Sequence, residues 1–310
     1  MPLRSASALI FLYALGYPIG ALAVSVMPPM MVLVFRFTLA ALILGVWALI
    51  ARVTWPTAMT LVHVLVSGLL AQGVLFVGLY LALEHGAPAV LGAVVVSMNP
   101  VMTALLAAVF LGESLTIRRI VALLIGVAAV LAACAGRLLA TGGVDAAMGL
   151  LVAALLGIAA GGVYQQRFCA AVDFRVTATL QNAVCVGPVV VLAALSPLAI
   201  RNPWHAAGAV AAVVLLNATL CMTMYVRAIN LHGAAAVSML FCVIPAVAGV
   251  LSWAMLGQRP DVGIGMGLIL GAVACWLNAR ASRQQRQHDP ADNGRGQHRV
   301  DTIHDAAVPR

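Results

Sequence analysis

Long apolar runs fill most of the chain, and each run ends at a charge, a proline or a glycine. Read between these breaks, the pattern predicts ten helices of about 20 residues, enough to cross a hydrocarbon core of roughly 30 Å. The first five are predicted over Ser5–Val26, Met30–Ala51, Leu61–Leu83, Ala89–Leu111 and Arg119–Gly136. The second five are predicted over Gly149–Cys169, Val176–Ser196, Ala206–Ile229, Gly233–Leu256 and Val262–Ala279. The expected fold is therefore an all-α membrane protein embedded in the lipid bilayer.

Composition agrees with this interpretation. Of the 310 residues, 64% are hydrophobic and only 8% are charged, whereas soluble domains carry about 25% charged residues. The formal net charge of +8 comes from arginines at predicted helix ends and in the tail, so membrane topology explains it and no nucleic-acid partner is expected. The six cysteines all fall inside apolar segments, without the spacing of a zinc site. Neither a metal nor a cofactor is therefore expected.

The distribution of arginine predicts the orientation, because cytoplasmic segments of membrane proteins are enriched in basic residues. With ten spans, both termini lie on one side. Segments on that side contain Arg4, Arg52, Arg118, Arg119, Arg167, Arg175, Arg227, Arg280, Arg283 and Arg286. Segments on the other side contain only Arg137, Arg201 and Arg259. Both termini are therefore expected in the cytoplasm. Residues 280–310 are polar and aperiodic, which predicts a disordered cytoplasmic tail.

Several distinctive residues recur 145 positions apart. The pairs are Gln72 with Asn217, Tyr80 with Tyr225, Pro100 with Pro245, Leu111-Gly112 with Leu256-Gly257, and Gly126 with Gly271. The repeating unit contains five predicted helices, and an odd number inverts the second copy in the membrane. Inverted repeats of this kind are typical of transporters, whose substrate site lies near the midplane between the repeats. We expect one repeat over residues 5–136 and the other over 149–279.

The stretches "SMNPVMTALLAAVFLGESLTIRRIVALLIGVAAVLAA" and "AINLHGAAAVSMLFCVIPAVAGVLSWAMLGQRPDVGIGMGLILGAVACW" resemble the EamA family of the drug/metabolite transporter superfamily. The resemblance covers nearly all of residues 5–280. It implies a ten-helix exporter in the bacterial inner membrane, with both ends cytoplasmic, that moves amino acids or similar small-molecule solutes and is not an enzyme. Gln258 stands where the family usually has glutamate.

Polar side chains in the middle of predicted helices are candidate ligands for a solute. Gln72 and Asn217 each lie about 15 Å from either helix end, and an amide at that depth must face protein or a water-filled cavity. An ordinary interhelical hydrogen bond is the alternative. Arg36, roughly 9 Å inside its helix, either snorkels to the surface or anchors a carboxylate-bearing solute. Tyr80 and Tyr225 are candidate aromatic walls of the chamber, with interfacial anchoring as the alternative. Tyr17-Pro18 breaks the regularity of the first helix at mid-depth, and Tyr17 is a further candidate ligand for the solute.

Proline in the centre of a helix frees a backbone carbonyl and weakens the helix locally. Pro100 and Pro245 are therefore candidate hinges for alternating access, with a packing kink as the alternative. Asn99 is a candidate to line the path beside the first of them. Glu113 follows the glycine that ends the fourth helix, and a structural cap is favoured there over proton carriage. No acid or histidine is well placed for a relay in the interior, so facilitated diffusion fits at least as well as proton coupling.

Several other assignments remain open at this point. A polytopic membrane enzyme would need a catalytic set at one depth, and the chain has no GxSxG, no HExxH and no interior His-Asp pair. A nucleotide-sugar carrier would need several basic residues in the cavity, and only Arg36 qualifies; a drug-like solute is a further alternative. Gly263, Gly267 and Gly271 form a small-residue face that predicts either a scaffold seam or a homodimer contact.

Overall fold

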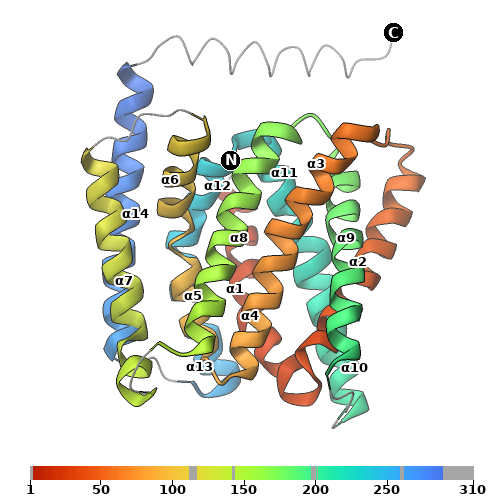
Figure 1. Ribbon diagram of the computed structural model, residues 1–310, viewed down its shortest axis with the longest axis horizontal. Helices are drawn as coiled ribbons and strands as arrows, with labels where there is room; N and C mark the ends of the chain where they lie inside the picture. The colour runs from red at the N-terminus through yellow and green to blue at the C-terminus, as the bar shows by residue number, and fades with distance from the viewer. Residues whose placement is uncertain are drawn as a thin grey trace.

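The computed structural model describes residues 3–111, 117–141, 144–196, 200, 202–258 and 262–288. In these ranges every regular element is helical, and the helices stand side by side as one bundle (Figure 1). The elements of the first half are α1 (Leu3–Val26), α2 (Pro29–Ile50), α3 (Ala58–Gly68), η1 (Leu69–Val74), α4 (Leu75–Glu84), α5 (Ala89–Val96), α6 (Asn99–Leu111) and α7 (Ile117–Thr141). Those of the second half are α8 (Ala146–Phe168), α9 (Phe174–Ala194), α10 (Pro203–Ala212), η2 (Val213–Cys221), α11 (Met222–His232), α12 (Ala234–Ser238), η3 (Met239–Cys242), α13 (Ile244–Leu256) and α14 (Val262–His288).

Seven helices of the described chain are long and apolar enough to cross a membrane. An eighth is added if the bent pair Ala234–Cys242 and Ile244–Leu256 forms one span. The α7 and α14 helices carry shorter apolar stretches, Ile120–Ala135 and Val262–Leu277. Large apolar side chains such as Leu42 and Leu124 are exposed on the outer faces, as expected of helices that contact lipid. The protein is therefore a multi-pass integral membrane protein, and the count of ten spans stays a prediction.

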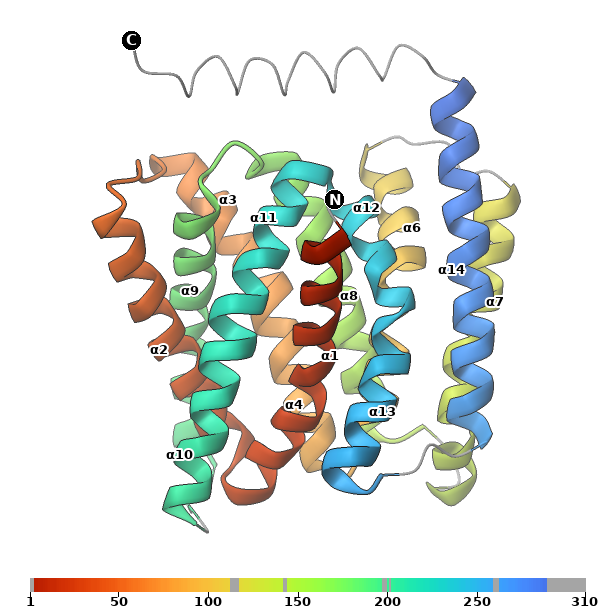
Figure 2. The same cartoon turned by 180° about the vertical axis from the view of Figure 1, so that it is seen from behind.

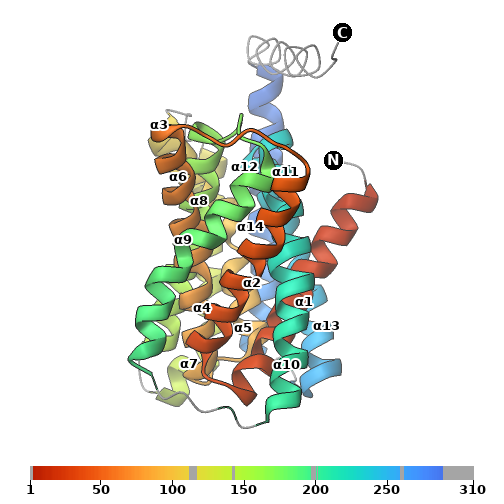
Figure 3. The same cartoon turned by 90° about the vertical axis from the view of Figure 1, so that its right-hand side faces the viewer.

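Helices from the two halves of the chain pack against one another. The α2 helix runs along α9, and α7 runs along α14 at one edge of the bundle (Figures 1 and 2). The α1 helix lies against α13 and against the continuous helix formed by α10, η2 and α11 (Figure 3). The centre of the bundle is thus built from both halves, and the polar residues described below lie between them.

Four helices depart from regular α geometry in the interior. The helix from Ala58 to Glu84 contains the π-helical segment η1, and the helix from Pro203 to His232 contains the π-helical segment η2. A turn at Ser97 and Met98 separates α5 from α6. The bend between α12–η3 and α13 is 44°. Pro100 and Pro245 each lie near the start of the helix that follows the break, which is where proline is tolerated because the first turn needs no amide donors.

The small-residue face of α14 packs inside the chain. A Cβ added at Gly267 would lie 2.6 Å from Ala133 Cβ and 2.9 Å from the carbonyl oxygen of Ala129, both on α7. A Cβ at Gly271 would lie 2.7 Å from the end of the Met98 side chain. Two of the three glycines therefore form an intramolecular seam, because only a residue without a side chain permits helices to approach so closely.

Helix ends differ from the predicted ones where capping chemistry operates. Asp145, Asp173 and Asn202 accept hydrogen bonds from backbone amides at the starts of α8, α9 and α10, so these helices begin two to three residues earlier than predicted. The Arg175 side chain bonds to Asp173 and is the main reason that the pKa of this carboxyl lies below its ordinary value. At the other end, α14 continues to His288, past Ala279, because arginine and glutamine are good helix formers.

Candidate functional site

A buried arginine lies at the centre of the polar contacts between the two halves. The Arg36 side chain is 0% exposed, so it does not snorkel to the surface. Its Nη1 donates to Asn217 Oδ1 at 3.3 Å, and its Nη2 donates to Gln72 Oε1 at 3.4 Å. The guanidinium of α2 therefore joins the two amides that recur in the sequence, one from η1 and one from η2. We call Arg36, Gln72 and Asn217 the central polar cluster.

The π-helical segments explain how both amides reach the arginine. The residues of η1 shifted by 145 positions, the separation of Gln72 and Asn217, fall within η2. A π-helical turn accommodates an extra residue and changes the direction of the side chains that follow, and such turns are frequent at functional sites. The two halves thus share a local distortion as well as a polar residue.

An aromatic ring lies against the face of the guanidinium. Arg36 Cζ lies 3.4 Å from the centre of the Phe76 ring and 5.4 Å from that of Phe37. A cation over an aromatic face is stabilised by the ring quadrupole, by roughly 2 kcal/mol or more when water is absent. Phe76 belongs to α4 and lies one turn after Gln72, so the same helix supplies an amide and a ring to the arginine.

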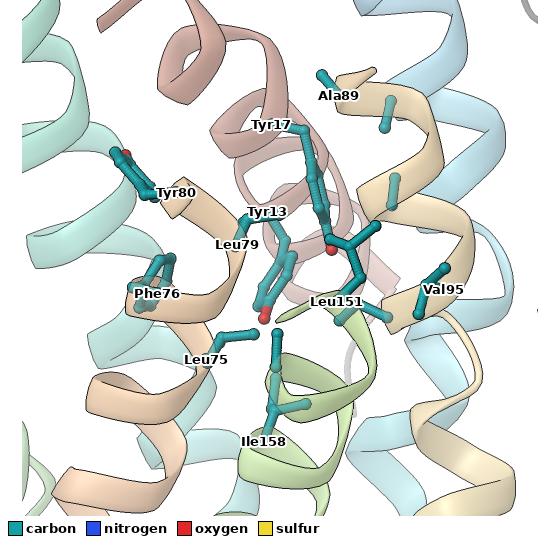
Figure 4. Close-up of a cluster of buried hydrophobic side chains, with 14 of the residues drawn as sticks. Tyr13, Tyr17, Leu75, Phe76, Leu79, Tyr80, Ala89, Val95, Leu151 and Ile158 are labelled. Carbon is teal, nitrogen blue, oxygen red and sulfur yellow. The ribbon is translucent and has the colours of Figure 1, made fainter. Parts of the chain in front are cut away.

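A narrow cavity adjoins the central polar cluster. It is lined by Tyr13, Gly16 and Tyr17 of α1, by Leu75, Phe76 and Leu79 of α4, and by Asn217. Its volume for water-sized occupants is about 10 Å³, room for about one water molecule. Figure 4 shows Tyr13 pointing from α1 toward Leu75 and Ile158, beside Tyr17 of the same helix. The helices are closed around the cavity in this conformation. The cavity must widen before a metabolite can enter it.

The predicted aromatic residues occupy different places relative to this cavity. Tyr17 lines it, and so does Tyr13, which sequence reasoning missed. Tyr225 lies behind Tyr13, with ring centres 6.1 Å apart, and both rings contact Phe241. Tyr80 packs edge-on against Phe76 at 6.4 Å, and a Cβ on Gly20 would lie 3.3 Å from its hydroxyl oxygen. Tyr80 and Tyr225 therefore support the cavity walls from behind.

The first residue of α6, Asn99, faces the interior at the helix break. It is 1% exposed, and its Oδ1 accepts from Thr103 Oγ1 at 3.0 Å. Asn99 does not line the cavity itself. The hinge role of Pro100 and Pro245 stays a prediction.

A second buried polar network was not predicted. Gln181 Nε2 donates to Ser67 Oγ at 2.9 Å and to Gln165 Oε1 at 3.0 Å. Gln165 Nε2 in turn donates to Asn230 Oδ1 at 3.0 Å. These residues join α3, α9, α8 and α11. Gln181 is the repeat partner of Arg36. This correspondence was the one sign in the sequence that the position is buried in each half of the chain.

Two residues near the ends of the predicted fourth and ninth helices remain. Gln258 Oε1 accepts from the backbone amide of Ala89 at 3.3 Å, so it caps the start of α5 from the end of α13. Glu113, predicted to cap the fifth helix, lies outside the described residues.

Comparison with known proteins gives one family. The model of the EamA-like transporter family matches residues 5–134 and 146–280. Twenty-two chains of solved structures match as well. One of them, described only as "Crystal structure of protein", has a TM-score of 0.63 and 19% sequence identity over 92% of this chain and 99% of that chain, which is evidence for a shared fold. A comparison with curated protein sequences gives no match.

Proposed function

The chain belongs to the EamA-like transporter family, and from this premise we propose that it exports amino acids or related small metabolites across the bacterial inner membrane by alternating access. In this proposal ten spans form two inverted five-helix repeats, with both termini in the cytoplasm. The solute passes through the central cavity between the repeats, where the side chains of the central polar cluster bind it.

Three features of the fold support two inverted repeats. The family match falls into two segments that together exceed half of the chain. The packed pairs α2–α9 and α7–α14 each join helices that hold equivalent places in the two predicted repeats. The π-helical segments η1 and η2, and the breaks before Pro100 and Pro245, follow the same register.

One observation carries the functional proposal. A buried arginine, two amides and an aromatic ring meet beside a cavity in the middle of the bundle, although nothing in the packing of apolar helices requires a charge there. Ionisable residues inside a membrane protein are costly and mark substrate or ion pathways. The side chains come from α2, η1 and η2, that is, from both halves of the chain, which supports a site between two repeats.

The proposal is tested by a metabolite screen followed by flux measurements. Cells that overexpress the protein should release at least one small metabolite in excess of cells that carry an empty vector. The purified protein in proteoliposomes should then move that solute with saturable kinetics. Flux with and without an imposed pH gradient decides between proton coupling and facilitated diffusion. If neither cells nor proteoliposomes move any solute above control, the proposed transport function is wrong.

A further inference from the structure

The charge of Arg36 has no acidic partner in the described part of the chain. The acidic residues described there are Glu84, Asp145 and Asp173. Glu84 is exposed at the end of α4, Asp145 caps α8, and Asp173 pairs with Arg175 at 2.8 Å. A fully buried cation is therefore held by neutral groups alone, although buried charges are ordinarily paired.

The hydrogen bonds of Arg36 are incomplete. Its contacts to the Asn217 and Gln72 amides, at 3.3 and 3.4 Å, are longer than the 2.7–2.9 Å typical of charge-assisted bonds to a carboxylate. Its Nε is buried and finds no acceptor among the described residues. A guanidinium presents its donors as a planar fork that fits a carboxylate in two parallel bonds. The unused N–H donors of Arg36 can thus bind an added acceptor while the two amides hold the guanidinium in place.

A second polar atom beside the cavity lacks a hydrogen-bond partner. The Tyr13 hydroxyl is buried and has no hydrogen-bond partner in the described structure, which costs free energy in the absence of a ligand. Tyr13 lines the same cavity as Asn217 and Phe76, and both of these residues also contact Arg36. The rest of the lining consists of Gly16, Leu75, Leu79 and the Tyr17 ring.

We infer that the solute carries a carboxylate that pairs with Arg36, that its apolar part packs between α1 and α4, and that Tyr13 donates to a second polar group. This inference rests on the proposed transport function and adds the chemical class of the solute. No described acidic residue faces the cavity to pair with an ammonium group. The carboxylate is therefore required for binding, while an amine is dispensable.

The test uses matched ligands and the full-length protein in detergent. Each set keeps one side chain, that of alanine, leucine or phenylalanine, and presents it as the amino acid, the hydroxy acid and the amine without the carboxylate. Binding is measured as the concentration-dependent rise in melting temperature. In at least one set, the amino acid and the hydroxy acid should bind with affinities within about tenfold of each other. The exchange of the ammonium group for a hydroxyl alters at most one hydrogen bond to a neutral group of the protein. The amine should not bind. An amine that binds as tightly as its acid, or no carboxylate binding in any set, overturns the inference.

Two variants locate the binding to the predicted atoms. Arg36→Met should weaken carboxylate binding by roughly 30-fold or more, the effect of removing one partner of a buried charge pair. Tyr13→Phe should weaken it by about threefold to tenfold. Arg227→Met is the control, because Arg227 contacts the Phe174 ring away from the cavity. Carboxylate binding that survives Arg36→Met unchanged contradicts the assignment.

Measurements of solute flux show whether the inferred solute class or the proposed transport function is wrong. Wild-type proteoliposomes that transport a solute without a carboxylate would leave the proposed function intact and refute the solute class. Wild-type protein that binds carboxylates but moves no solute would refute the proposed function.

Discussion

Replacing Gly16 with alanine tests whether the position of Asn217 controls the site. A Cβ on Gly16 would lie 2.2 Å from Asn217 Nδ2, and ordinary contact begins at 3.4 Å, so the amide must move by 3.4 − 2.2, or about 1.2 Å. The same amide accepts from Arg36 at 3.3 Å, near the upper limit for such a bond. Loss of a hydrogen bond to a charged group costs roughly 1.5–3 kcal/mol, which corresponds to at least about tenfold in solute affinity.

Stability should change much less than affinity in this variant. The atom that blocks the new methyl group is the tip of a side chain, so we expect a stability loss near the lower end of the 1–3 kcal/mol typical of overpacking. Gly162→Ala is the matched control, because its nearest neighbour would be Ala234 Cβ at 3.6 Å. Solute affinity from concentration-dependent flux and the melting temperature are measured for both variants. Wild-type affinity in a folded Gly16→Ala protein would refute the role given to Asn217.

Three further predictions concern the central polar cluster, a helix break and the packing of α8. Gln72→Ala and Asn217→Ala should each lower flux in proteoliposomes by about tenfold, since each removes a bond to Arg36, while the protein stays folded in the membrane; full flux in both would contradict this. Pro100→Ala should change the turnover rate more than the affinity, and an unaltered turnover would argue against a hinge. Gly161→Ala should lower the melting temperature or prevent folding, because its Cβ would lie 2.6 Å from the backbone nitrogen of Ala71; a wild-type melting temperature would show that α8 can move away.

The features that repeat along the chain were predicted best. Gln72 and Asn217 stood out because they share one register, and the structure brings both to the same arginine. The breaks near Pro100 and Pro245 followed from the missing amide hydrogen of proline. Repeats preserve such residues at equivalent depth, so their approximate place in the fold can be read from the sequence alone.

Features without a repeat partner, or with an ordinary chemical identity, were missed. Tyr13 corresponds to Ile158 in the second half, so no polar pair drew attention to it. The meeting of Arg36 with both amides depends on the reach of its side chain and on the π-helical turns, which single-sequence periodicity does not indicate. Gln165 lies near a predicted helix end, where a polar residue is ordinary, and only the packing of four helices shows that it is buried.

Counterflow in proteoliposomes tests the central claim most directly. The solute found in the metabolite screen is loaded inside the vesicles, and uptake of its labelled form is compared for the wild type, Arg36→Met and Arg227→Met. The proposed site predicts saturable uptake by the wild type, nearly the same uptake by Arg227→Met, and a loss of roughly 30-fold or more in apparent affinity for Arg36→Met. Equal uptake by the wild type and a folded Arg36→Met protein would contradict the claim that the solute binds at the central polar cluster.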